Sequence, residues 1–99
     1  HNGYQQTDAV DRVQPLDPMP PKLEAFGWAA REIDGHSLEE VAMAYEWANS
    51  TTGAPQVIVA RTVKGKGVTQ LEETPAKWHG KPLSEEDGQR ALEEIGAAP

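Results

Sequence analysis

The sequence predicts an α/β fold in which parallel strands are joined by crossover helices, and three observations lead to that prediction. Two short segments, residues 28–33 and 56–63, have the composition of strands. The second is apolar at its centre, residues 57–60, without polar alternation, which is typical of a parallel strand covered on both faces. A helical pattern over residues 37–52 separates the strands, so a right-handed βαβ unit is expected.

The helix over residues 37–52 has clear start and stop signals. Ser37 can accept a hydrogen bond from the backbone N–H of Glu40, and the Glu40 carboxylate can reach back, as in a capping box. Gly53 and Pro55 end the helix. Its helical spacing predicts one buried stripe, formed by Leu38, Val41, Ala42, Tyr45 and Ala48.

Two further helices are expected. Residues 20–27 form a short helix with proline in its first turn and Gly27 at its C-terminus. A last helix is capped by Ser84, ends at Gly96 and carries its apolar residues on one face, namely Ala91, Leu92 and Ile95. The final residues, 97–99, are expected to fray.

The remaining chain is expected to be irregular. Residues 1–21 contain four prolines and little periodicity, which predicts an irregular segment on a surface. Residues 64–83 are expected to form a long loop with no element of its own, and loops of that length are usually functional or disordered.

Composition narrows the class of protein. Ninety-nine residues suffice for one small domain and not for two. The net charge of −7 argues against a nucleic-acid surface, and no apolar run reaches the roughly 20 residues of a membrane span. The chain has no cysteine and no secretory signal, which fits a cytoplasmic protein. The hydrophobic content of 37% is low, which indicates part of a larger core or a domain that buries one side against a partner. The start at His1 rather than methionine suggests a processed, tagged or truncated start.

A basic, glycine-rich loop follows the second strand. It reads Lys-Gly-Lys-Gly over residues 64–67, and Lys77 and Lys81 add charge nearby. A cationic loop at the C-terminal end of a buried strand is where a phosphate is expected, and His79 can add a donor there. The alternative is a solvated turn with a surface histidine.

Oxygen ligands lie near the N-terminus. Asn2 and Asp8 flank a glycine turn and suit a hard cation such as Mg²⁺, although Asn-Gly is also an ordinary turn sequence. His36 is expected to be structural. Because there is no Gly-x-Ser-x-Gly, His-Glu-x-x-His, P-loop or cysteine nucleophile, no complete catalytic site is visible in these residues.

Four segments in a fixed order carry a family resemblance. They are residues 22–28 (KLEAFGW), 33–36 (IDGH), 61–68 (RTVKGKGV) and 78–80 (WHG). Their order and spacing resemble transketolase, in particular the N-terminal subunit of the bacterial and archaeal split form. The resemblance extends over residues 1–96 and implies a partial thiamine-diphosphate-binding fold.

The resemblance implies a function and a set of site residues. It implies a cytoplasmic, dimeric enzyme of the pentose phosphate pathway that uses thiamine diphosphate and Mg²⁺ to transfer a two-carbon ketol unit from a ketose phosphate to an aldose phosphate. By likeness to the family, Asn2 is the side-chain ligand of Mg²⁺ and Tyr4 its carbonyl ligand. His79 resembles the histidine that reaches the diphosphate and the hydroxyl end of the substrate.

The chain also departs from the family pattern. His1-Asn2 stands where the family usually has Asp-Asn, and the Gly-Asp-Gly motif, the catalytic glutamate and the early histidines are absent. Residues 1–99 therefore resemble the C-terminal part of a diphosphate-binding domain, with residues 1–21 on the cofactor side and residues 64–83 as the active-site loop. The expected partners are the remaining transketolase domains or a C-terminal subunit, in a homo- or hetero-oligomer, with sugar phosphates as substrates and no nucleic acid or membrane. Alone, the chain is expected to be inactive.

Two alternatives stay open. One is a 1-deoxy-D-xylulose-5-phosphate synthase-like thiamine enzyme, which has a similar Lys-Gly-Lys-Gly loop, although the segment Trp78-His79-Gly80 favours transketolase. The other is a non-catalytic α/β module that docks through its apolar strand and helix faces.

Overall fold

The computed structural model describes residues 1–96 and divides the chain into two compact units. Unit 1 consists of His1 and Leu16–Thr62, and unit 2 consists of Asn2–Pro15 and Val63–Pro99. The expected fraying of residues 97–99 lies outside the described residues. None of the helices among residues 1–96 has the length and apolar character to cross a membrane.

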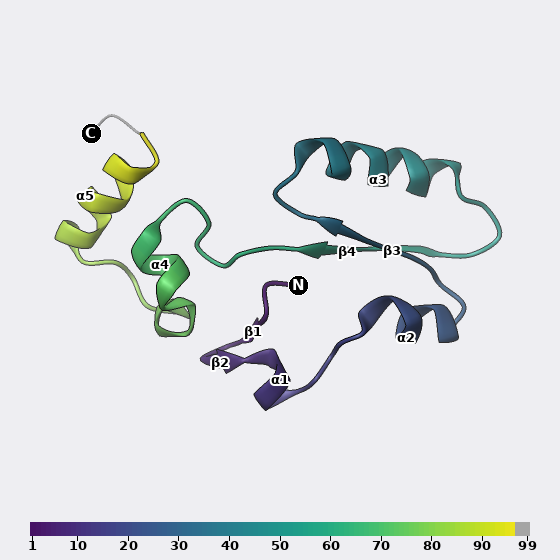
Figure 1. The fold of residues 1–99 in the computed structure, drawn as a ribbon, viewed down its shortest axis with the longest axis horizontal. Coiled ribbons are helices and arrows are strands. Elements are labelled where there is room, and N and C mark those ends of the chain that lie inside the picture. The colour runs from purple at the N-terminus through teal and green to yellow at the C-terminus, as the bar shows by residue number, and fades with distance from the viewer. Residues whose placement is uncertain (97–99) are drawn as a thin grey trace. The chain divides into compact units, whose positions relative to one another are not determined.

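Unit 1 is built on two parallel strands. Strand β3 (Ala29–Asp34) pairs with β4 (Gln56–Arg61) in parallel, and helix α3 (Leu38–Ser50) is the crossover between them. Figure 1 shows α3 and helix α2 (Met19–Ala25) on opposite sides of this pair. The predicted α/β class, with parallel strands and a crossover helix, is confirmed. Helices on both faces bury the apolar side chains of the parallel strands.

The predicted buried stripe of α3 is wrong in part. Ala44, which was not in the stripe, is fully buried, whereas Leu38 is 86% exposed and Tyr45 is 64% exposed. The small side chain of Ala44 lets the helix approach the strands, where Ile33 and Val59 complete the core. Of the predicted stripe, Val41 and Ala48 are half-buried, whereas Leu38, Ala42 and Tyr45 lie on an exposed apolar face.

Local signals set the ends of these elements. The Ser37 hydroxyl accepts from the Glu40 N–H at 3.2 Å, as predicted. The Glu40 carboxylate does not return to the cap but accepts from the backbone N–H of Asp34 at 2.7 Å, which ties α3 to the end of β3. The turn between them requires glycine, because a Cβ on Gly35 would lie 2.6 Å from Thr62 Cγ2.

The N-terminal part of unit 2 is ordered, so the prediction of an irregular segment over residues 1–21 is corrected. Strands β1 (Tyr4–Gln5) and β2 (Asp8–Ala9) form an antiparallel hairpin, and helix α1 (Val10–Val13) follows directly. Gln6 adopts a left-handed backbone with φ of 53° at the hairpin turn. The prediction missed the hairpin because this position carries no glycine, the usual signal for such a backbone.

The predicted loop over residues 64–83 is also corrected, because it contains two short helices. These are α4 (Thr69–Glu73) and the 3-10 helix η1 (Pro75–Trp78). Helix α5 (Glu85–Glu94) follows, and its Ser84 cap is confirmed by a 3.1 Å hydrogen bond from the Asp87 N–H. The buried side chains of this part are Val68, Pro75 and Ala91.

Candidate functional site

Asn2 and Tyr4 present two oxygen atoms at one edge of the hairpin. The Tyr4 N–H donates to Asn2 Oδ1 at 3.0 Å, and the neighbouring Gly3 carbonyl accepts from Val10 N–H at 2.9 Å. Because hydrogen-bonded and non-hydrogen-bonded pairs alternate in an antiparallel ladder, Tyr4 opposite Ala9 has its N–H and C=O turned outward. The Asn2 side-chain oxygen and the Tyr4 carbonyl oxygen therefore lie on the same outer edge.

Asp8, the other oxygen ligand predicted at this turn, is already engaged within the hairpin. Its Oδ1 accepts from the Ala9 N–H at 2.7 Å and from Arg12 Nε at 2.9 Å. The hydrogen bond from Arg12 holds the pKa of the Asp8 carboxyl below its ordinary value, so the group is ionised and paired. The described residues contain no cluster of three or more His, Cys, Asp or Glu side chains able to hold a metal ion.

The Lys-Gly-Lys-Gly loop is folded onto α4 and uses its own backbone donors. Three consecutive N–H groups have partners within unit 2: Lys66 with Val63 O at 3.2 Å, Gly67 with Glu72 Oε1 at 2.7 Å, and Val68 with Gly65 O at 3.1 Å. An anion at this loop would thus meet ammonium groups rather than these backbone donors. Among residues 1–96, Lys64 and Lys66 form no ion pair, so both charges are available.

His79 follows η1 on a braced turn. Trp78 Nε1 donates to Gln70 O at 3.2 Å and to Thr74 Oγ1 at 3.1 Å, and Lys77 lies 4.5 Å from the Trp78 ring centroid. The His79 side chain is exposed and, within the described part of the chain, makes no hydrogen bond or ion pair. Its imidazole is therefore free to bind a ligand. Like Asn2 and Tyr4, it belongs to unit 2.

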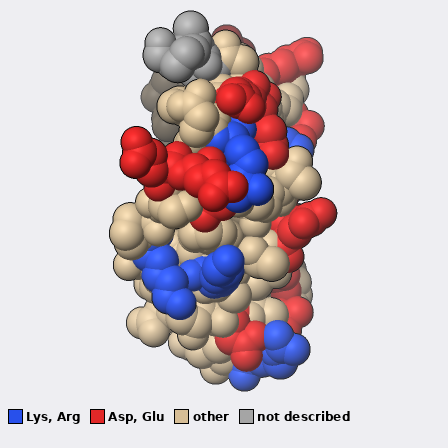
Figure 2. All heavy atoms as spheres, turned by 90° about the vertical axis from the view of Figure 1, so that its left-hand side faces the viewer, with Lys and Arg blue, Asp and Glu red and all other residues tan. Residues whose placement is uncertain are grey.

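The surface around these elements is not uniformly basic. On the face shown in Figure 2, Lys and Arg side chains form small groups separated by Asp and Glu side chains. This distribution follows from 16 acidic against 9 basic residues. A small anion would be bound by a few lysines.

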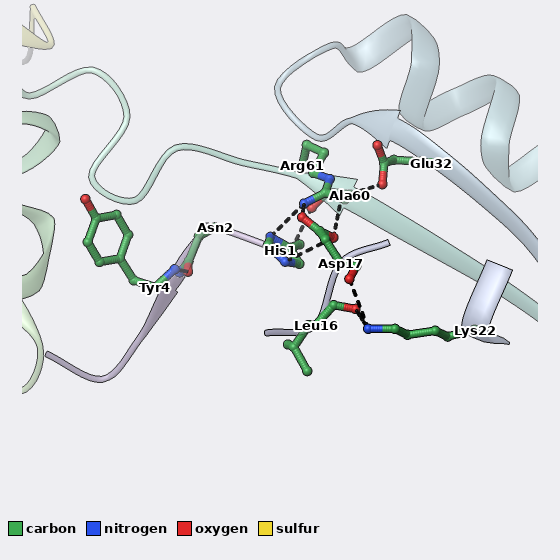
Figure 3. Close-up of polar contacts among 9 residues, drawn as sticks. All are labelled: His1, Asn2, Tyr4, Leu16, Asp17, Lys22, Glu32, Ala60 and Arg61. Atoms are coloured by element: carbon green, nitrogen blue, oxygen red, sulfur yellow. Dashed lines mark hydrogen bonds and ion pairs between the residues drawn. The ribbon is translucent and has the colours of Figure 1, made fainter. Parts of the chain in front are cut away.

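The prediction missed a polar cluster at the end of β4, which we call the Arg61 cluster: His1, Asp17, Glu32 and Arg61. Both Asp17 carboxylate oxygens accept from the Arg61 guanidinium, at 2.7 and 2.9 Å, and Glu32 Oε2 accepts at 2.7 Å (Figure 3). Hydrogen bonds that the guanidinium donates to Asp17 and, second, to Glu32 raise the pKa of Arg61, and the hydrogen bond from Arg61 lowers the pKa of Asp17. A charged residue such as Arg61 at the end of an apolar strand indicates that an oppositely charged side chain lies nearby, although the sequence does not show which one.

The fold and these groups define a class of protein. It is an α/β domain in which a parallel strand leads into a lysine- and glycine-rich loop, the arrangement in which open α/β folds bind phosphate groups. The hairpin adds hard oxygen donors, and the turn after η1 adds an exposed histidine.

Comparison with known proteins narrows this class to one family. Residues 8–99 match the family model described as transketolase, thiamine diphosphate binding domain. Transketolase of Rattus norvegicus is 38% identical over 94 residues, and that of Homo sapiens is 37% identical over 94; each alignment covers 95% of this chain and 14% of the relative. The 6-deoxy-6-sulfo-D-fructose transketolase subunit of Clostridium sp. (strain MSTE9) is 36% identical, over 96% of this chain and 34% of the relative. The chain belongs to the transketolase family, in its thiamine diphosphate-binding domain.

The match is also partial in a defined way. The chain spans 14% of the length of the full transketolases and about a third of the length of the transketolase subunits that it resembles. The predicted family is therefore confirmed, and the chain corresponds to only part of the length of these relatives.

Proposed function

We propose that this chain is part of a transketolase that moves a two-carbon ketol unit from a ketose phosphate to an aldose phosphate. The observation that carries the proposal is the match of residues 8–99 to the thiamine diphosphate-binding domain of that family. Thiamine diphosphate, when bound, supplies the electron sink for cleavage of a carbon–carbon bond. The contribution proposed for the residues in this chain is to bind and orient the cofactor and the substrate.

Asn2 and Tyr4 are proposed to hold Mg²⁺ beside the diphosphate. The two oxygens at the edge of the hairpin fit the preference of Mg²⁺ for hard donors. They are too few for its octahedral shell, so phosphate oxygens, water and residues outside this chain would supply the rest. Asn2 Oδ1 already accepts from the Tyr4 N–H, and that bond fixes the side chain in place before any cation arrives.

His79 and the loop lysines are proposed to meet the anionic part of the cofactor or substrate. An imidazole N–H can donate to a phosphate or hydroxyl oxygen, and the exposed ring of His79 has no competing partner among residues 1–96. Lys64 and Lys66 add positive charge without a paired carboxylate in the same range. Hydrogen bonds to ionised groups are stronger than those between neutral groups. Substitution of His79 is therefore expected to have the largest effect on ketol transfer.

The partner is proposed to be the remaining transketolase polypeptide, either further domains or a second subunit. Large apolar side chains are left uncovered in unit 1, with Phe26 83% exposed and Leu38 86% exposed. Single exposed apolar residues are ordinary, but Leu38 and Tyr45 share one face of α3. Two of the relatives are named as transketolase subunits, which supports completion of the site by another chain in at least some members.

The test is a pair of assays on the complete protein that contains this chain. Ketol transfer is measured from a ketose phosphate to an aldose phosphate, with thiamine diphosphate and Mg²⁺ present, and transfer is expected. Activity only with pyruvate as donor, with release of carbon dioxide, would instead favour the deoxyxylulose-phosphate synthase chemistry. The isolated 99 residues are titrated with the cofactor in parallel. Tight binding by them alone would contradict a site completed by other polypeptide.

A further inference from the structure

The Arg61 cluster joins the two ends of one chain segment. His1 immediately precedes residues 2–15, and Asp17 lies just after them. Arg61 Nη1 contacts His1 Nδ1 at 3.0 Å and also donates to Asp17 Oδ2 at 2.9 Å (Figure 3). One guanidinium therefore holds both ends of the segment that carries Asn2 and Tyr4.

His1 is fixed to β4 through its backbone as well. Its backbone nitrogen donates to Ala60 O at 2.7 Å, and its carbonyl accepts from the Thr62 N–H at 3.1 Å. Bonds from one residue to the positions on each side of Arg61 are the pattern of a parallel β-bridge. His1 thus lies opposite Arg61 as the last residue of a strand would.

The side chain of His1 is oriented by its surroundings. Because arginine only donates, Nδ1 of His1 must accept from Arg61, and the ring proton then lies on Nε2. That nitrogen is 3.6 Å from Asp17 Oδ1, and the side chain is 9% exposed. The imidazole therefore has the Arg61 guanidinium at Nδ1 and the Asp17 carboxylate near Nε2.

The far end is held a second time. Lys22 Nζ on α2 donates to the carbonyl oxygens of Leu16, at 2.7 Å, and Asp17, at 3.0 Å. The Arg61 contact to Glu32 differs, because Glu32 belongs to β3 and to neither end of the segment. This difference provides an internal control.

We propose that Arg61 is a positioning residue that closes the base of residues 2–15 and so pre-organises Asn2 and Tyr4 for the cation and diphosphate. The proposal rests on the proposed function for those two ligands. Holding both ends of the segment removes conformations that binding would otherwise have to select, and pre-organisation of ligands favours binding. Arg61 itself touches no cofactor in this account.

The first test needs no ligand and uses the complete protein. Hydrogen exchange is measured for the amides of residues 2–15 in the wild type and in Asp17→Asn, Glu32→Gln, Arg61→Gln and Arg90→Gln. Faster exchange is expected in Arg61→Gln and Asp17→Asn, and unchanged exchange in Glu32→Gln. Arg90→Gln is the matched control, because Arg90 makes a similar ion pair with Asp87 on α5. Equal exchange in the wild type and all variants would show that Arg61 does not hold the two ends of residues 2–15.

The second test measures the Mg²⁺ concentration that gives half-maximal thiamine diphosphate binding. Asp17→Asn is expected to raise this Mg²⁺ concentration about tenfold, the lower end of the effect of losing groups that orient a metal ligand, with kcat at saturating metal unchanged within about twofold. Glu32→Gln is expected to leave it unchanged. If the wild type binds cofactor with metal but Asp17→Asn does not shift the requirement, the positioning role is refuted. If the wild type shows no metal-dependent binding, the proposed function fails instead. The hydrogen-exchange result still decides whether Arg61 holds the two ends of residues 2–15. Asp17→Asn retains the side-chain volume of Asp17 and is expected to fold. Both tests can therefore be carried out with Asp17→Asn even if Arg61→Gln does not fold.

Discussion

Gly65 and Leu71 approach so closely that a Cβ added to Gly65 would lie 2.4 Å from the Leu71 Cβ. Gly65 also has a φ of 80°, in the left-handed region. The contact folds the Lys-Gly-Lys-Gly loop onto α4, and it makes glycine necessary at this position for two separate reasons.

Gly65→Ala is expected to destabilise the complete protein by about 2–5 kcal/mol, the sum of the left-handed backbone cost and of overpacking. Gly80→Ala is the control, since Gly80 has a φ of 69° but no atom within 4 Å of an added Cβ. It should cost only about 1–2 kcal/mol. Denaturant unfolding measures both, and equal losses would show that the approach of Leu71 is not restrictive.

His79→Ala in the complete enzyme is expected to lower kcat/KM by the equivalent of about 1–3 kcal/mol, the value of one hydrogen bond to a charged group. His36→Ala provides the comparison, because His36 lies in unit 1 beside the cap of α3 and outside the candidate site. Steady-state ketol transfer is measured for both. If the two variants kept wild-type kcat/KM alike, His79 would be removed from the site.

Val59→Asp is expected to cost about 3 kcal/mol or more and to prevent stable folding, because it buries an unpaired charge at the centre of β4. Val59 is 6% exposed and lies opposite Glu32 in the register of β3 and β4, in the core of unit 1. Val13→Asp should be tolerated, since Val13 is 52% exposed. Thermal unfolding distinguishes them, and similar melting of the two variants would contradict the core assignment.

Asp17 makes part of the stability depend on pH. The hydrogen bond from Arg61 lowers its pKa below the ordinary value of 3.8, so the folded state favours the ionised carboxylate. This contribution is complete above the unfolded pKa and is lost as the pH falls through the lower folded pKa. The difference in unfolding free energy between wild type and Asp17→Asn should thus be constant from neutral pH to about pH 4, and should shrink in more acidic solution. A difference that grew on acidification would reverse the sign and refute the pairing.

Much of the fold could be predicted because its signals are local. Ser37 and Ser84 cap the helices that the sequence assigns to them, and Gly27 and Gly96 adopt the positive φ of helix ends. The hairpin over residues 4–9 escaped prediction because Gln6, not glycine, supplies the left-handed turn. Its two strands are only two residues long each, which is too short for an alternating apolar pattern to be recognised.

Other features could not be predicted because they depend on contacts distant in sequence. The apolar residues of α3 occur on two faces, and only packing against β3 and β4 decides that Ala44 is buried while Leu38 is exposed. The Arg61 cluster joins residues 44 positions apart, and no spacing rule connects Asp17 with Arg61. Asn2 and His79 were singled out from the residues and again by family resemblance, Tyr4 came from the resemblance alone, and their roles stay predictions.

The most direct test of the account is the Mg²⁺ dependence of thiamine diphosphate binding by the complete protein, measured by isothermal titration for wild type, Asn2→Ala and Asn49→Ala. Asn49 is an exposed residue of α3 in unit 1 and serves as the matched control. We expect the wild type and Asn49→Ala to bind the cofactor only with metal, and Asn2→Ala to bind at least about tenfold more weakly. Identical, metal-independent affinities in all three proteins would contradict the central claim that this hairpin serves a diphosphate-bound cation.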